Sequence, residues 1–189
     1  MPSFDNKKFY KKSIAQYGIS AQGVHWNSKY SQYKRFEILT SFIQKEIALS
    51  SIIDVGCGFA EYYNYLKKNA CTPKKFIGID RENAMTAISR QRFPHLDFHT
   101  LNILEDTLLK SDYYICSGAM NLLNEKEFFH FLTQCYAHSQ KGFIFNFLKN
   151  ESYNQIKSEN VILFCQQLTK TIEIKDNYLD NDISIFLKR

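Results

Sequence analysis

Short apolar runs alternate with amphipathic stretches along most of the chain, which predicts strands and helices in turn. Apolar runs typical of strands buried on both faces of a parallel sheet occur at residues 51–55, 75–80, 96–101, 112–116 and 142–148. Apolar positions three and four apart predict helices over residues 61–68, 83–92, 125–138 and 160–168. We therefore expect a mostly parallel sheet whose strands are joined by right-handed helical crossovers.

The two ends of the chain depart from this alternation. Residues 4–17 and 28–49 suit helices, and the apolar side chains Phe36, Leu39, Ile43 and Ile47 fall on one face of the second. Residues 171–175 and 183–187 suit strands, and the turn-rich segment 176–182 between them predicts an antiparallel hairpin. We expect a single α/β domain over residues 1–189, with N-terminal helices in residues 1–49 and a seven-stranded core in residues 50–189.

The first predicted strand runs into a loop with two glycines, Gly56 and Gly58, which lie between Asp54 and Glu61. Glycine allows a sharp turn and lets a ligand approach the backbone closely. The second predicted strand ends in Asp80, whose carboxylate can accept hydrogen bonds from both hydroxyls of a ribose. A dinucleotide-binding loop would need glycine at the position of Glu61, and a carboxylate there would repel a pyrophosphate. The unit therefore predicts a nucleoside ligand other than a dinucleotide.

The series Asp54-x-Gly56-x-Gly58-x-Ala60 resembles motif I of the class I S-adenosylmethionine-dependent methyltransferases, with Ala60 at the place of the family's third glycine. The resemblance extends from about residue 26 to the C-terminus. It implies a Rossmann-like three-layer sandwich that ends in the antiparallel hairpin, an N-terminal helical lid, and S-adenosyl-L-methionine as the cofactor. Asp54 would then receive the methionine ammonium group, directly or through water.

The resemblance also implies cofactor contacts at the ends of the later strands. Arg81 and Met85 would lie beside the adenine, and Asn102 and Ile103 stand where the family has an aspartate and an apolar residue for the same ring. The expected cofactor-binding residues are Trp26, Arg35, Asp54, Gly56, Cys57, Gly58, Asp80, Arg81, Met85, Asn102, Ile103, Ser117 and Gly118.

The segment from Trp26 to Arg35 is the expected lid. Arg35 could pair with the methionine carboxylate through a bidentate guanidinium, while Trp26 would cover the methyl-transfer site. The alternative is that Trp26 anchors the following helix and Arg35 is exposed to solvent. No residue is marked as a general base, although His25 is a candidate. Glu61 and Asn146 are candidates for the rim of the cofactor edge.

Composition and charge argue against several classes of protein. The five cysteines are odd in number and not closely paired, which argues against a disulfide framework or a zinc ribbon. We expect no metal site, since His95 and His99 lack an evident third ligand. No secretory signal or membrane-spanning stretch is visible, so we expect a cytoplasmic protein. The net charge of +5 comes from scattered basic residues, which favours a solvated surface over a nucleic-acid footprint.

The segment after the fourth predicted strand, Ser117-Gly118-Ala119-Met120, bears on the acceptor. Amino-directed DNA and protein-glutamine methyltransferases usually have Asn/Asp-Pro-Pro-aromatic here, and no RNA-binding appendage is visible. We therefore expect a small-molecule acceptor, chosen by the N-terminal helices. An RNA or protein acceptor is one alternative. A binding module without transfer chemistry is another, which a pocket blocked by Phe59 or Tyr62 would favour.

Overall fold

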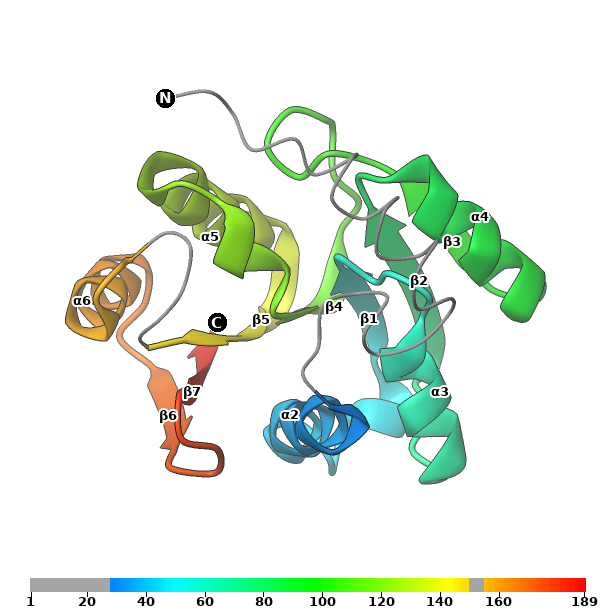
Figure 1. Ribbon diagram of the computed structural model, residues 1–189, viewed down its shortest axis with the longest axis horizontal. Helices are drawn as coiled ribbons and strands as arrows, with labels where there is room; N and C mark the ends of the chain where they lie inside the picture. The colour runs from blue at the N-terminus through cyan, green and yellow to red at the C-terminus, as the bar shows by residue number, and fades with distance from the viewer. Residues whose placement is uncertain (1–27, 150–154) are drawn as a thin grey trace.

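The computed structural model describes residues 28–149 and 155–189, which form a three-layer sandwich around one seven-stranded sheet (Figure 1). The strands are β1 (Ser51–Val55), β2 (Lys75–Asp80), β3 (Asp97–Thr100), β4 (Ser111–Ser117), β5 (Ser139–Leu148), β6 (Ile172–Asp176) and β7 (Asp182–Lys188). Their order in the sheet is β3-β2-β1-β4-β5-β7-β6. The first five strands pair in parallel, and β7 runs antiparallel to both β5 and β6. The predicted fold class is confirmed, including the C-terminal antiparallel hairpin.

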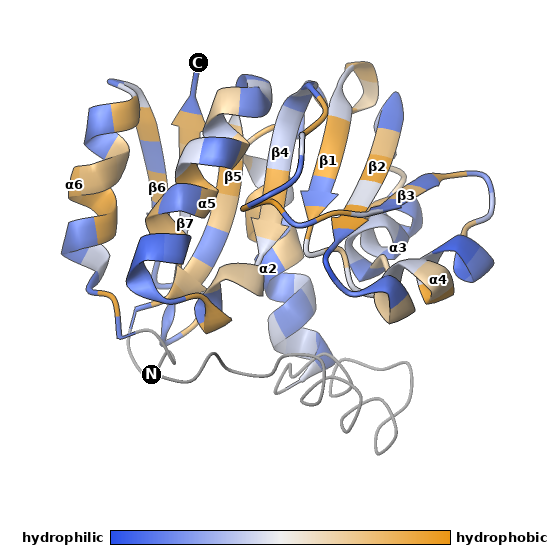
Figure 2. Cartoon of the chain, turned by 90° about the horizontal axis from the view of Figure 1, so that it is seen from above, coloured by the Kyte–Doolittle hydropathy of each residue, from blue (hydrophilic) through white to orange (hydrophobic). Residues whose placement is uncertain are grey.

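Helices cover both faces of the sheet, as Figure 2 shows. They are α2 (Lys29–Ser41), α3 (Glu61–Lys68), α4 (Asn83–Arg92), α5 (Glu125–His138) and α6 (Ser158–Leu168). One apolar cluster joins one face of the sheet to α2 and α3, and a second cluster joins the opposite face to α5 and α6. Strand residues alternate between these two clusters, because successive side chains of a strand point to opposite faces.

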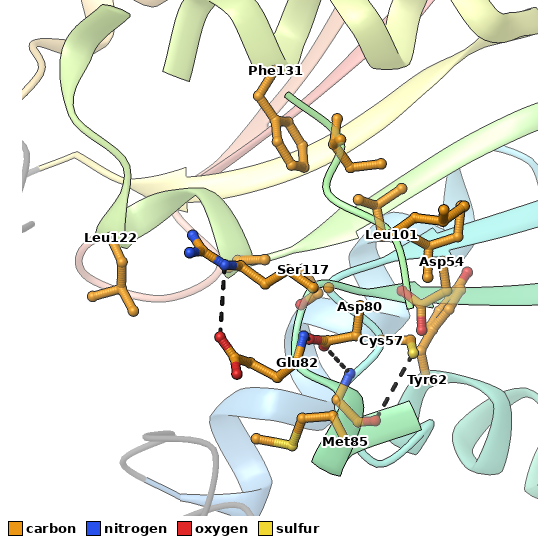
Figure 3. Close-up of a pocket in the computed structure, with 18 of the residues that line it drawn as sticks. Asp54, Cys57, Tyr62, Asp80, Glu82, Met85, Leu101, Ser117, Leu122 and Phe131 are labelled. Atoms are coloured by element: carbon orange, nitrogen blue, oxygen red, sulfur yellow. Dashed lines mark hydrogen bonds and ion pairs between the residues drawn. The ribbon is translucent and has the colours of Figure 1, made fainter. Parts of the chain in front are cut away.

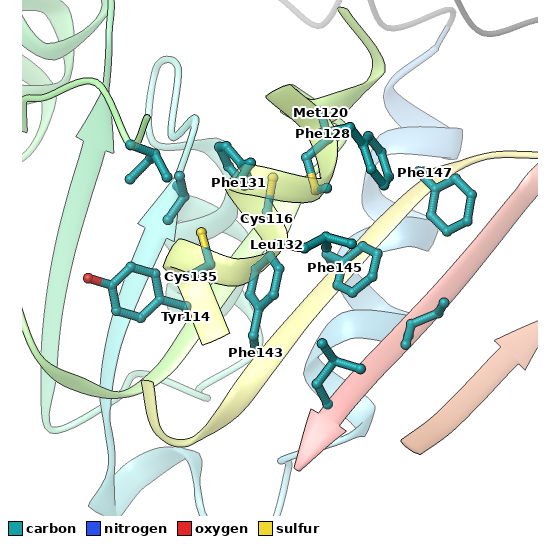
Figure 4. Packing of buried hydrophobic residues seen from close by; sticks show 14 of the residues in the cluster. Tyr114, Cys116, Met120, Phe128, Phe131, Leu132, Cys135, Phe143, Phe145 and Phe147 are labelled. Atoms are coloured by element: carbon teal, nitrogen blue, oxygen red, sulfur yellow. The ribbon is translucent and has the colours of Figure 1, made fainter. Parts of the chain in front are cut away.

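The second cluster is rich in phenylalanine (Figure 4). Along β5, the rings of Phe143 and Phe145 stack with centroids 4.9 Å apart, and those of Phe145 and Phe147 with centroids 6.0 Å apart. Phe128 of α5 meets Phe147 edge-on at 5.7 Å. All four side chains are buried, so β5 forms the centre of this half of the core.

The N-terminal helix is shorter than predicted. α2 ends at Ser41, whose hydroxyl donates to the carbonyl of Ile38 at 2.6 Å, a local bond that competes with continued helix. A turn then leads to the short 3-10 helix η2 (Ile47–Leu49). The apolar face was nevertheless predicted correctly, because Phe36, Leu39, Ile43 and Ile47 are all buried. The helix predicted over residues 4–17, and with it His25 and Trp26, lies outside the described residues.

The strand order places a crevice at the middle of the sheet. From β1 the chain moves outward through β2 and β3, and then returns to pair β4 with the other side of β1. The helices that follow β1 and β4 therefore lie on opposite faces, and the carboxyl ends of these two strands are left open between them. Open α/β sheets bind their ligands at this kind of switch point.

Candidate functional site

A pocket occupies the predicted crevice, at the carboxyl ends of β1, β2 and β4 (Figure 3). It encloses about 1130 Å³, including its open mouth. The structure brings together eleven of the thirteen residues expected to bind a cofactor: Asp54, Gly56, Cys57, Gly58, Asp80, Arg81, Met85, Asn102, Ile103, Ser117 and Gly118. Trp26 lies outside the described residues, and Arg35 is not among the residues that line the pocket.

Asp54 is the most unusual group in the pocket. It is only 3 % exposed, and its carboxylate accepts no hydrogen bond from any residue in the described part of the chain. Burial, and then the negative charge of Asp80, raise the pKa of Asp54 to about 8. A buried carboxylate without a partner is costly unless it is neutralised or meets a cation. The site can therefore supply a charge partner to a cationic ligand group.

The glycine loop brings its backbone close to the segment after β4. The Gly56 and Cys57 N–H groups both donate to the carbonyl of Ile79, at 2.8 and 3.0 Å, which ties the loop to β2. Gly56 has a φ of +72°, and a Cβ added there would lie 2.3 Å from the Cβ of Ala119. Ala60 also has a positive φ, +59°, so it adopts the left-handed conformation that glycine favours. Ala60 is also the position at which the loop sequence departs from motif I, where the family has its third glycine.

Asp80 is held by backbone N–H groups at the end of β2. Gly58 donates to one carboxylate oxygen and Glu82 to the other, each at 2.9 Å. Burial raises the pKa of Asp80 to about 6, although these two N–H groups act in the opposite direction. Each oxygen keeps a lone pair for a further donor, so the carboxylate can receive two adjacent hydroxyls.

The other half of the pocket is a mainly apolar slot. Met85 and Ile103 line it, and Asn102 contributes an amide whose oxygen already accepts from the N–H of Leu104 at 3.1 Å. One lone pair of that oxygen is left for a ligand donor. Several apolar lining residues were not expected from the sequence, because an aliphatic or aromatic side chain carries no chemical signal. They include Leu101, Leu104, Leu122, Leu123 and Phe131.

Arg35 has a role that the sequence did not reveal. Its guanidinium forms a buried bidentate ion pair with Asp182 of β7, with Nε–Oδ1 at 2.5 Å and Nη2–Oδ2 at 2.7 Å. The alternative of a solvent-exposed Arg35 is wrong, and the guanidinium faces Asp182, not the pocket. Asn146 is not a rim residue either, because it is fully buried and donates to the same carboxylate. Gln32, one turn before Arg35 on α2, lines the pocket instead.

Glu61 lines the pocket as a paired carboxylate. Its Oε1 lies 2.5 Å from Nη2 of Arg92, and its Oε2 accepts from Asn64 at 3.1 Å. Burial alone would raise the pKa of Glu61, but these hydrogen bonds outweigh it and hold the pKa below its usual value. Phe59 and Tyr62 form part of the wall, and the pocket remains open beside them.

Other kinds of site were sought in the described residues. No three His, Cys, Asp or Glu side chains in residues 28–149 and 155–189 gather closely enough to hold a metal ion. In the same residues, no helix combines the length and apolar character needed to cross a membrane. The five cysteines are free thiols, and burial raises the pKa of Cys57, Cys116, Cys135 and Cys165.

Part of the chain is similar in sequence to known methyltransferases. Residues 52–142 match a family model described as a methyltransferase domain. The putative methyltransferase 235L of Invertebrate iridescent virus 6 is 27% identical over 126 residues, which cover 63% of this chain and 47% of the viral protein. The chain thus spans about half the length of this curated relative.

Solved structures share the whole fold at low sequence identity. The N-methyltransferase NodS from Bradyrhizobium japonicum, in complex with S-adenosyl-L-homocysteine, has a TM-score of 0.72 and 14% identity, covering 98% of this chain and 99% of its own. The magnesium protoporphyrin IX methyltransferase from Synechocystis, with bound S-adenosylmethionine, has a TM-score of 0.68 and 12% identity, covering 100% of both chains.

Proposed function

We propose that the protein transfers a methyl group from S-adenosyl-L-methionine to a small-molecule acceptor, since residues 52–142 match a methyltransferase domain and the whole chain shares its fold with solved methyltransferases. The observation that carries this proposal is Asp54, a buried carboxylate that faces the pocket without a protein partner among the described residues. A ligand with an ammonium group would supply the missing charge.

The other lining residues fit the remaining parts of this cofactor. Asp80 can accept from both ribose hydroxyls, and Met85 and Ile103 offer apolar contact to the adenine faces. Gly56 and Gly58 present backbone without a side chain to the pocket, so a ligand can approach the loop closely there. When bound, S-adenosyl-L-methionine supplies an electrophilic methyl group on a sulfonium.

The chain's own contribution to the reaction is alignment and exclusion of water. Methyl transfer is an in-line displacement, for which correct placement of the two reactants supplies much of the acceleration. No histidine is among the described residues that line the pocket, and Glu61 is already paired with Arg92. In this proposal α2 is the described part of the lid, since its Gln32 and Phe36 form part of the pocket wall.

The charge of the pocket supports a small neutral or cationic acceptor over a nucleic acid. Among the described residues that line it, the carboxylates of Asp54, Glu61, Asp80 and Glu82 stand against one guanidinium, that of Arg81. Nε of Arg81 itself lies 3.6 Å from Oε1 of Glu82. A polyanionic backbone would be repelled by such a surface.

Calorimetry on the full chain tests the cofactor assignment. We expect S-adenosyl-L-methionine and S-adenosyl-L-homocysteine to bind and NAD not to bind. Asp80→Ala should weaken both sulfur ligands, whereas the matched variant Asp97→Ala, at an exposed position on β3, should bind them normally. Tighter binding of NAD than of either sulfur ligand would contradict the proposal. Transfer is then followed with labelled methyl donor in a metabolite extract.

A further inference from the structure

One edge of the sheet is formed by β6, which among the strands of the described residues pairs only with β7 (Figure 1). The side chains of β6 alternate in character. Ile172 and Ile174 lie on the face covered by α5 and α6, whereas Glu173 and Lys175 lie on the face covered by α2. Ile174 is 44% exposed, and Glu173 is exposed as well. In the described part of the chain, this edge is therefore free to accept a further strand.

The backbone groups of β6 that face outward belong to alternate residues. Thr171, just before β6, accepts from the N–H of Lys188 at 3.0 Å, so these two opposite residues form a hydrogen-bonded pair. In an antiparallel ladder such pairs alternate with pairs that exchange no bond. The residues at odd positions of β6 therefore point their N–H and C=O groups to β7. Those at even positions, with Ile174 in the middle, point theirs to the open edge.

The charges of β6 select one way of pairing with a second copy of the strand. A two-fold axis through an antiparallel pair places one residue opposite its own copy. If that residue is Glu173 or Lys175, like charges face each other, which is destabilising. If it is Ile174, Glu173 of each copy lies opposite Lys175 of the other, and Ile174 exchanges two hydrogen bonds with its copy. Of the registers centred within β6, this one alone sets both charges opposite a charge of the other sign.

Lys175 has a charge available for this contact. Its Nζ donates to the Ser41 hydroxyl at 2.5 Å and lies 4.5 Å from the centre of the Phe42 ring. No carboxylate in residues 28–149 and 155–189 lies within ion-pair distance of Lys175, whereas Glu173 is paired with Lys188. Charged side chains on an edge strand usually keep other strands away. In β6 the two signs alternate, so they repel a copy in the wrong register and attract it in the right one.

We propose that β6 is a dimerisation surface and that its partner is a second copy of this chain, paired antiparallel and centred on Ile174. The pairing joins the two seven-stranded sheets into one continuous sheet. It uses none of the residues that line the pocket, so this inference is independent of the proposed function. A pairing of five residues buries less area than a permanent dimer needs, so we expect a reversible association.

Sedimentation velocity of the full chain tests this assignment between about 1 and 200 μM, where an interface of small size is partly formed. The 22.2 kDa chain should pass from monomer to dimer across this range. Glu173→Lys and Lys175→Glu should each weaken the dimer at least about tenfold, because both contacts across the axis become repulsive. An equimolar mixture of the two variants should form dimers within about threefold of the unchanged protein, since each variant supplies the charges that the other lacks.

Ile174→Pro gives a second test that leaves the charges unchanged. The Ile174 N–H faces away from β7, so proline removes the central bonds of the proposed pair and no bond between β6 and β7. This variant should keep its circular dichroism spectrum and stay monomeric over the whole range. Asp97→Lys is the control, because it makes the same change of net charge as Glu173→Lys but at an exposed position on β3, the opposite edge of the sheet. It should dimerise like the unchanged protein.

Four results would each overturn the assignment. They are a monomer at all these concentrations, a dimer that survives Ile174→Pro or either charge reversal, a mixture of the two reversed variants that stays monomeric, and loss of the dimer in Asp97→Lys. Recovery of the dimer in the mixture cannot come from a folding defect of either variant, so it reports on the contact between Glu173 and Lys175 alone.

Discussion

Replacing Asp54 with asparagine is expected to stabilise the ligand-free protein and at the same time weaken cofactor binding. Burial, followed by the charge of Asp80, raises the pKa of Asp54 to about 8, whereas an aspartate in an unfolded chain has a pKa of about 3.9. Between these values the folded protein binds more protons than the unfolded one, so its stability falls as the pH rises. Asparagine has nearly the same shape and cannot ionise, so the variant should lose this pH dependence.

The size of the effect follows from the two pKa values of Asp54. One pKa unit corresponds to about 1.4 kcal/mol, so the free energy of unfolding should fall by roughly 1 kcal/mol per pH unit between pH 5 and 8 because of this residue. The free energy of unfolding of Asp54→Asn should therefore exceed that of the unchanged protein by roughly 1 kcal/mol more with each pH unit. Loss of a hydrogen bond to a charged group should weaken S-adenosyl-L-homocysteine binding by about 1.5–3 kcal/mol.

Urea unfolding at pH 5, 6, 7 and 8, with calorimetry of S-adenosyl-L-homocysteine at pH 8, measures both effects. Asp112→Asn is the control. For Asp112, hydrogen bonds from Ser51 at 2.8 and 3.0 Å outweigh burial and hold the pKa below its usual value. The ionised Asp112 carboxylate stabilises the fold fully at any pH above the pKa that it has in the unfolded chain. This stabilisation is lost only as the pH falls through the lower pKa that Asp112 has in the folded protein. Asp112→Asn should therefore be less stable throughout pH 5–8 and bind the ligand normally. Equal pH slopes for Asp54→Asn and the unchanged protein would refute the reasoning.

Four other substitutions, in three experiments, test separate parts of the structure. Asp80→Ala should weaken S-adenosyl-L-homocysteine binding by about 1.5–3 kcal/mol, measured by calorimetry, and unchanged affinity in a folded variant would exclude Asp80 as the ribose acid. Gly56→Ala should abolish binding and lower the free energy of unfolding by more than about 1 kcal/mol, because a left-handed φ is unfavourable with a Cβ and Ala119 occupies the space; a fully stable variant would argue against this packing. Arg35→Met and Asp182→Leu should each cost about 3–5 kcal/mol in urea unfolding, and the double variant much less than their sum, since each single change leaves a buried charge uncompensated. Additive losses would contradict the ion pair.

Elements with local signals at their ends could be predicted from the sequence. α5 begins where Asn124 accepts from the N–H of Glu127 and the Glu127 carboxylate accepts from the N–H of Asn124, each at 3.0 Å. All the residues of such a cap lie within one turn, so the pattern is readable in a linear chain. The end of α2 at Ser41 was not predicted. Its hydroxyl makes a local bond to Ile38, but it also accepts from Nζ of Lys175 at 2.5 Å, and a partner 134 residues away is not marked in the sequence.

In the pocket, too, residues close together in the sequence could be predicted and contacts between distant residues could not. Asp54 and the glycine loop belong to one short motif, and Asp80 ends the next strand, so a sequence shows them together. Arg35 and Asp182 are 147 residues apart, and nothing in the sequence marks them as partners. A carboxylate from the last strand thus takes the guanidinium that the sequence had assigned to a ligand.

The position of β7 has a consequence for how the protein reaches its folded state. β7 lies between β5 and β6 although it follows both in the chain, and in the described residues β6 pairs with no other strand. Until β7 arrives, β6 cannot join the sheet and β5 keeps an open edge. That edge belongs to a strand with an uncharged run from Phe143 to Leu148 that includes three phenylalanines, a composition that pairs readily with strands of other chains. Docking of β7 therefore competes in time with self-association, and substitutions that slow it would reduce the yield of soluble protein even where the finished fold is fully stable.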